Sequence, residues 1–150
     1  MSNFLIKTIL KESTIPNAGI GRFFDEDCNS NTIIRKQKIN SESLQMLEES
    51  QQFDDLIFLS KFGHTSPDNC ELYNSHIFIN VPPNNTNHSK NPNIFYVFDE
   101  NYKYTITLKD VKKDNEMLQD YTTFKKIEWF EQLLNQNNLL SARQFAKSLQ

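Results

Sequence analysis

The chain has 150 residues, of which 37% are hydrophobic and 23% charged, with 16 Lys and Arg against 19 Asp and Glu. This length is typical of one domain with a single core and excludes a second full domain. The net charge of −3 argues against a nucleic-acid binder held by phosphate contacts. Two cysteines, Cys28 and Cys70, with no Cys-x-x-Cys motif, exclude a four-cysteine zinc site.

The start of the chain lacks a basic segment followed by a continuous apolar stretch, and no apolar run approaches the ~18 residues of a membrane helix. We therefore expect a cytoplasmic or nuclear protein without a signal peptide or transmembrane segment. Its thiols should be reduced in such a compartment.

Glycine is scarce and asparagine is abundant. Average usage predicts roughly ten glycines in this length, whereas the chain has three, and two of them are Gly19 and Gly21. Asparagine tolerates left-handed turns better than other side-chain-bearing residues, so it can replace glycine in ordinary turns. The pair Gly19 and Gly21 therefore suggests a task that asparagine cannot perform.

The first half of the chain predicts short strands followed by helix. Residues 4–10 are rich in Ile, Leu and Phe and predict a first strand, residues 15–21 a turn, and residues 32–34 a short strand. Apolar residues at three-to-four spacing then predict one or two helices as an insert at about 41–61. These residues are Leu44, Leu47, Phe53, Leu56 and Ile57.

The middle of the chain predicts a strand, a polar loop and a hairpin. Residues 77–81 alternate and end at Pro82-Pro83, and residues 84–93 are too polar for a regular element. Residues 94–98 and 102–108 flank Asp99-Glu100-Asn101 in a hairpin pattern. On the second strand of this hairpin one face carries Tyr104, Ile106 and Leu108.

The C-terminal part predicts two helices. The first has an apolar stripe of Ile127, Phe130 and Leu134. The second begins at Ser141, which with Gln144 has the spacing of a capping box. Its apolar positions follow at helical spacing and are Ala142, Phe145, Ala146 and Leu149.

Three polar segments are weak signals singly but informative in order. They are Ile15-Pro-Asn-Ala-Gly-Ile-Gly21, Asn87-His-Ser-Lys-Asn-Pro-Asn93, and Glu116 followed by Asp120-Tyr121. Alone, the first fits a tight turn, the second a polar loop, and Tyr121 a core aromatic. Together they resemble the SET-domain protein lysine methyltransferases, over roughly residues 4 to 124. The Asn-His-Ser-x-x-Pro-Asn segment is the most specific element of the resemblance.

The resemblance implies a fold of small twisted sheets, of the β-clip kind, in which residues 87–93 cross residues 116–121 in a knot-like arrangement. It implies a SET domain over 1–123 and a helical extension over 124–150. It also implies S-adenosylmethionine as cofactor, with the glycine turn and the Asn-His pair as its binding residues. The matching positions are Gly19, Ile20, Gly21, Asn87 and His88. Tyr121 matches the tyrosine at the junction of methyl donor and target lysine.

The implied chemistry is transfer of a methyl group to a neutral lysine amine of a protein tail, for example of a histone, with no metal. Because free lysine has a pKa of about 10.4, the site must favour loss of its proton. Tyr121 would catalyse through its hydroxyl. Candidate walls of the lysine channel are Tyr73, Gln119, Phe124 and Trp129. We expect a protein substrate and no binding to nucleic acid or membrane. The sequence leaves open whether the chain forms a homodimer.

The sequence also departs from the family pattern. Asp114-Asn115-Glu116-Met117 replaces the usual Gly-Glu-Glu-Leu, and no cysteine-rich tail follows Tyr121. These departures motivate an alternative, a SET-like module that has lost catalysis and binds other proteins. A further alternative, an unrelated aromatic β domain, would place residues 87–93 far from Tyr121.

Overall fold

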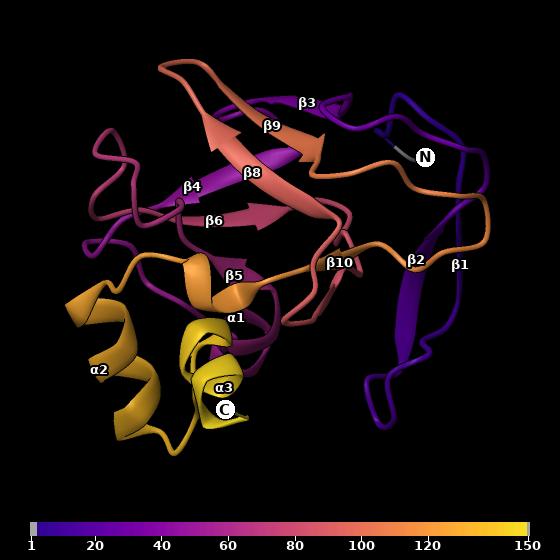
Figure 1. Ribbon diagram of the computed structural model, residues 1–150. Helices are drawn as coiled ribbons and strands as arrows, with labels where there is room; N and C mark the ends of the chain where they lie inside the picture. The colour runs from indigo at the N-terminus through magenta and orange to yellow at the C-terminus, as the bar shows by residue number, and fades with distance from the viewer. Residues whose placement is uncertain (1–2, 150) are drawn as a thin grey trace.

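The computed structural model describes residues 3–149, and within them most regular elements are strands. The strands form four separate small sheets, two with two strands and two with three, and the helices gather at one end of the molecule (Figure 1). This arrangement confirms the expectation of a mainly β fold built from small sheets with C-terminal helices.

An antiparallel pair, β1 (Thr8–Glu12) and β2 (Ile20–Phe24), carries the glycine turn between its strands. The prediction of a first strand over 4–10 is therefore wrong in its start. Phe4 instead bridges to Arg35, and the Leu5 N–H donates to the Ile34 carbonyl. Because these first residues pair with a different sheet, the chain must bend before β1 can begin.

A second sheet has the order β3-β9-β8 and consists of β3 (Ile33–Lys38), β8 (Ile94–Phe98) and β9 (Tyr102–Thr107), all antiparallel. The hairpin prediction is confirmed. On β9, however, the face that carries Tyr104 and Ile106 is the more exposed one, and the buried face carries Lys103, Thr105 and Thr107. The inner face of this sheet is unusually polar.

A third sheet contains β4 (Leu44–Leu47), β6 (Ile77–Asn80) and β5 (Gly63–His64), in the order β4-β6-β5. The prediction of helix across 41–61 is wrong for residues 44–47, and helix α1 covers only Leu56–Phe62. Leu44 and Leu47 pair with Asn80 and Ile77 of β6. Pairing with the buried strand β6 thus overrides their helical spacing.

The chain ends with the short strand β10 (Leu118–Gln119), the 3-10 helix η1 (Tyr121–Thr123), α2 (Glu128–Gln136) and α3 (Ala142–Ser148). Phe130 and Leu134 of α2 are buried, as the stripe predicted, and the Ser141–Gln144 capping box is present. Ala142 and Ala146 face inward, whereas Phe145 and Leu149 are about half exposed. The inward face of α3 is therefore narrower than its apolar spacing suggests.

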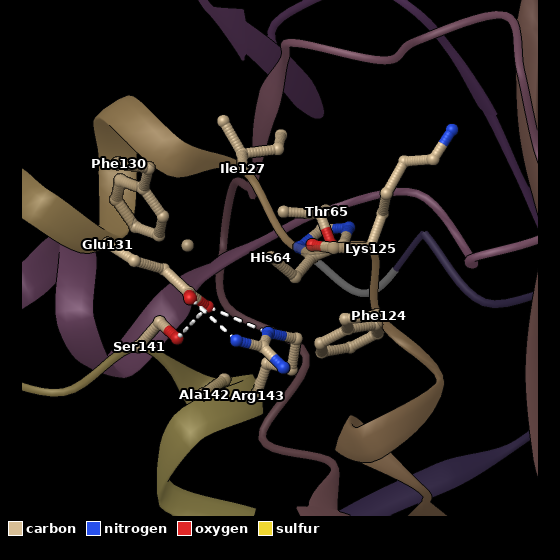
Figure 2. A pocket seen from close by; sticks show the side chains of 11 residues that line it. His64, Thr65, Phe124, Lys125, Ile127, Phe130, Glu131, Ser141, Ala142 and Arg143 are labelled. Carbon is tan, nitrogen blue, oxygen red and sulfur yellow. Dashed lines mark hydrogen bonds and ion pairs between the residues drawn. The ribbon is translucent and has the colours of Figure 1, made fainter.

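Helices α2 and α3 are joined by a buried carboxylate. Glu131 accepts two hydrogen bonds from Arg143, at 2.6 and 2.8 Å, and one from Ser141 Oγ at 2.9 Å. Figure 2 shows this cluster on the wall of a small cavity of about 10 Å³, which Phe124 and His64 also line. Helix α3 also packs against η1, which contains Tyr121.

Candidate functional site

Two segments of the resemblance lie side by side. The strand β7 (Asn87–His88) pairs in parallel with β10, so that Asn87 is opposite Leu118 and His88 opposite Gln119. Asn93 fixes the same contact, because its Nδ2 donates to the Glu116 carbonyl at 2.8 Å and its Oδ1 accepts from the Leu118 N–H at 2.9 Å. The expected neighbourhood of residues 87–93 and 116–121 is confirmed, and the unrelated aromatic domain is excluded.

The carboxylate of Glu116 joins all three segments. It accepts hydrogen bonds from Ser13 Oγ at 2.8 Å, from the Thr14 N–H at 2.9 Å and from Thr14 Oγ1 at 2.6 Å. Asn87 Nδ2 donates to the same carboxylate at 3.1 Å and to the Ile20 carbonyl at 3.2 Å. Glu116 therefore ties the glycine turn to the Asn-His-Ser segment.

These hydrogen bonds also set the charge of Glu116. Burial raises the pKa of this carboxyl, but the bonds from Thr14, Asn87 and Ser13 outweigh burial and lower the pKa below its ordinary value. Glu116 is therefore ionised at neutral pH. Its negative charge lies next to the glycine turn, where a cationic ligand would be favoured.

The two glycines of the turn have different constraints. Gly19 has a φ of +77°, a left-handed conformation, and open space where a Cβ would lie. A Cβ on Gly21 would lie 2.4 Å from Glu116 Oε2 and 3.3 Å from Asn87 Nδ2. Gly21 is thus required for close approach of the backbone to Glu116, a role that no asparagine could take.

Tyr121 contacts the Asn-His-Ser segment at the crossing. Its hydroxyl donates to the Thr86 carbonyl at 2.5 Å, and its backbone N–H donates to His88 Nδ1 at 3.0 Å. Burial, followed by the nearby Tyr96 and Glu116, raises the pKa of the Tyr121 phenol far above its usual value. Tyr121 is therefore a neutral hydroxyl whose oxygen can still accept a weak hydrogen bond.

An aromatic row continues from Tyr121 into the core. The ring of Phe124 stacks on Tyr121 with centroids 5.5 Å apart and on Tyr96 at 6.2 Å. The Tyr96 hydroxyl accepts a hydrogen bond from Asn84 Nδ2 at 2.7 Å. Two tyrosine hydroxyls thus bond to residues 84–86, just before Asn87. The sequence reasoning missed Tyr96, although its alternation with Ile94 and Phe98 could have placed it on the inner face.

The other predicted channel residues have different surroundings. Gln119 is buried at the crossing, where its carbonyl accepts from the Ser89 N–H. The Tyr73 ring packs on Phe78 and Phe98, and its hydroxyl donates to the carbonyls of Asp99 and Glu100.

Trp129 stacks on Phe53 at 5.9 Å, and its Nε1 donates to the Ser75 carbonyl at 3.4 Å. The structure therefore places Tyr121, Phe124 and Tyr73 in one hydrophobic cluster, with Gln119 two residues before Tyr121, and it leaves the Trp129 ring against another cluster.

Three further features of the described residues concern metal ligands, cysteines and membrane helices. Among residues 3–149, no three His, Cys, Asp or Glu side chains lie close enough to hold a metal ion. Cys28 and Cys70 are free thiols. None of the described helices is long and apolar enough to cross a membrane.

Comparisons with known proteins identify the fold. No family model matches the chain, and no curated protein matches it. Solved structures do match. A Plasmodium falciparum protein described as a candidate histone methyltransferase is 17% identical with a TM-score of 0.53, over 77% of this chain and 93% of that one.

A second match is the Chaetomium thermophilum Polycomb Repressive Complex 2 in an autoinhibited conformation bound to S-adenosylmethionine. It is 17% identical with a TM-score of 0.60, over 90% of this chain and 17% of that one. An apo form in an autoinhibited state is 16% identical with a TM-score of 0.59.

The fold is the SET fold that these methyltransferase structures share. At this level of identity the likeness establishes the fold, and this chain spans less than a fifth of the Polycomb chains that it matches. The chain has the SET fold, with the Asn-His-Ser segment and Tyr121 at its crossing.

Proposed function

We propose that the chain transfers a methyl group from S-adenosylmethionine to a lysine side chain of a protein, with a histone tail as the leading substrate. One observation carries this proposal. The Tyr121 hydroxyl meets the Thr86 carbonyl directly beside Asn87, and Asn87 is joined through Glu116 to the glycine turn. Donor-binding and methyl-transfer residues are thus contiguous in this proposal.

The residues beside the turn suit the donor. Gly21 presents backbone without a side chain next to Asn87 and Glu116. Asn87 uses its Nδ2 group for Glu116 and Ile20, and within residues 3–149 no group donates to its Oδ1, which can accept from an ammonium. The ionised Glu116 favours a cationic sulfonium nearby. Gly19, Ile20 and the backbone of His88 complete the proposed donor site.

Tyr121 would act by position and polarity. When bound, the donor supplies an electrophilic methyl group on a sulfonium. The Tyr121 oxygen and the Thr86 carbonyl would accept weak hydrogen bonds from that polarised methyl group and hold it in line. The rings of Tyr121, Phe124 and Tyr96 would exclude water from the target amine, which disfavours its charged form.

The alternative is a SET-like module that binds proteins without catalysis. It is favoured by Asp114-Asn115, which leaves Glu116 as the one acid of the pair, and by the lack of cysteine in residues 122–150, where the family carries a cysteine-rich tail. In this chain helix α3 packs against η1, the 3-10 helix that begins at Tyr121. The proposal therefore assigns to α2 and α3 the support that such a tail would give.

The test is incubation of the protein with isotopically labelled S-adenosylmethionine, core histones and a cell lysate, followed by mass spectrometry of lysine residues. We expect labelled lysine with the native chain and at least a tenfold loss with Tyr121→Phe. Tyr104→Phe is the matched control, because that hydroxyl bonds to Asp99 on the outer hairpin. Equal labelling by Tyr121→Phe would remove Tyr121 from its role, and no label with the native chain would favour the binding module.

A further inference from the structure

Arg35 is a guanidinium buried without a counter-ion. Its side chain is 1% exposed, and its Nε and Nη1 atoms have no hydrogen-bond partner in the structure. Among the ion pairs of residues 3–149 none includes Arg35. One face of the guanidinium lies 4.8 Å from the ring centroid of Phe4. Such a group is costly to bury, and its positive charge acts strongly on its surroundings.

The groups that face Arg35 from neighbouring elements add no negative charge. Arg22 on β2 lies over the same Phe4 ring, 4.5 Å from its centroid, and is also buried. His64 on β5 has its pKa lowered by burial and by the nearby cations, so it is neutral. Tyr96 on β8 interacts with Arg35 and keeps its proton at neutral pH, because burial raises the pKa of its phenol.

Lys103 is a buried amine beside Tyr96, in the same surroundings as Arg35. Its side chain is fully buried on β9, its Nζ lies 3.7 Å from the ring centroid of Tyr96, and it donates to Asn80 Oδ1 at 2.8 Å. Burial lowers the pKa of Lys103 well below its ordinary value, and the charge of Arg35 lowers it further. Burial and the charge of Arg35 therefore both disfavour the charged form of an amine against Tyr96.

We propose that Arg35 is a positioning residue whose buried charge keeps the target lysine amine unprotonated where Tyr96 and Tyr121 meet residues 84–86. This inference rests on the proposed function. The incoming ammonium releases its proton to water. The nitrogen lone pair then forms the new N–C bond while the C–S bond of the donor breaks, so that the sulfonium leaves as a neutral thioether and the product is a methylammonium.

The carboxylate that acts on Tyr121 does not cancel this effect. Glu116 is the acid in question, and its oxygens are held by Ser13, Thr14 and Asn87. These hydrogen bonds already stabilise its negative charge on the side of the donor turn. Arg35, by contrast, acts on Tyr96, whose hydroxyl is held by Asn84. The two charges therefore act on opposite partners of the reaction, the cationic donor and the amine that must be neutral.

The first measurement uses Lys103 as the reporter and needs no turnover. Lysine labelled with ¹³C at Cε is incorporated, the Lys103 signal is assigned by its loss in Lys103→Met, and its titration is followed by NMR. In Arg35→Met we expect the Lys103 midpoint to rise by roughly one pH unit or more. Arg35→Gln serves as a second uncharged variant if the Met variant does not fold. An unchanged midpoint would overturn the inference.

The second measurement is the pH dependence of kcat with saturating core histones and saturating donor, because kcat reports ionisations within the bound complex. Arg35→Met should act about tenfold more slowly at pH 7 and approach the native rate at high pH, since a one-unit shift is a tenfold change in neutral amine. Lys36→Met is the control, because Lys36 is the adjacent residue on β3 and its exposed side chain lies over Tyr102.

The outcomes separate the two proposals. Coincident pH profiles for the native chain and Arg35→Met would overturn the role of Arg35 while leaving methyl transfer intact. A loss that is equal at every pH would indicate a merely structural role and also overturn it. Absence of transfer by the native chain at any pH, together with absence of donor binding, would overturn the proposed function itself.

Discussion

The imidazole of His88 holds the backbone of Tyr121, because its Nδ1 accepts the Tyr121 N–H at 3.0 Å. The His88 side chain is 7% exposed. Burial lowers the pKa of His88, and the weaker opposing effect of Asp120 does not reverse this. The imidazole is therefore neutral at pH 7 with Nδ1 free of a proton. The histidine of the Asn-His-Ser segment thus positions the tyrosine of the Asp-Tyr pair.

We predict that His88→Leu lowers the free energy of unfolding by about 1–3 kcal/mol, since the Tyr121 N–H then lacks an acceptor. His88→Asn should lose less, because its Oδ1 can accept. The folded pKa lies below the ordinary 6.5, so the unfolded chain binds more protons on acidification. The stability due to His88 is present above pH 6.5 and declines as the pH falls through the folded pKa. Urea denaturation at several pH values measures this, and equal losses in the two variants would contradict it.

The two glycines of the turn should respond differently to alanine. Gly21→Ala forces a Cβ against Glu116 Oε2, which several hydrogen bonds hold in place. We expect a loss of about 2 kcal/mol in unfolding free energy and at least tenfold weaker donor binding. Gly19→Ala meets no atoms and should cost about 1 kcal/mol for its positive φ. Denaturation and donor titration of both variants measure the contrast. A Gly21→Ala protein with native donor affinity would contradict the account.

Lys103 should make the native chain less stable as the pH falls. Its folded pKa is well below the ordinary 10.5, so between these values the unfolded chain binds a proton that the folded chain does not. Unfolding free energy therefore rises with pH up to about 10.5. Lys103→Met removes this slope and should show a flatter profile between pH 7 and 10. Parallel profiles for the two proteins, by chemical denaturation, would show that Lys103 is charged in the fold.

Removing one partner of the buried pair Glu131 and Arg143 should be strongly destabilising. Both side chains are largely buried (Figure 2), so Arg143→Met leaves an unpaired buried carboxylate and should cost about 3 kcal/mol. The double variant with Glu131→Leu should regain much of that loss. Lys112→Met is the control, since its pair with Asp27 is exposed and should contribute nothing measurable. A small effect of Arg143→Met in urea denaturation would show that the helix pair is held by packing alone.

Segments with strong local signals were predictable from sequence. The Ser141–Gln144 capping box forms as its spacing indicates, and the hairpin of β8 and β9 lies where its turn residues predict. The neighbourhood of Asn87 and Tyr121 followed from the family resemblance. What could not be predicted depends on tertiary pairing, as for Leu44 and Leu47, which β6 holds in a strand.

The polar interior was also beyond a reading of the sequence. Hydrophobic alternation on β9 points to Tyr104 and Ile106 as the inner face, yet Lys103, Thr105 and Thr107 are the buried ones. Patterning by hydrophobicity cannot find such a face. For the same reason the buried Arg35 was missed, whereas Tyr96 could have been placed by its alternation with Ile94 and Phe98.

The most direct test of the central claim is a calorimetric titration of the native chain with S-adenosylmethionine. The account predicts saturable binding of one donor per chain, weakened at least tenfold in Gly21→Ala and unchanged in Tyr104→Phe. Absence of binding heat and of any thermal shift at millimolar donor would contradict it, and would leave the chain as a SET fold that binds proteins without a methyl donor.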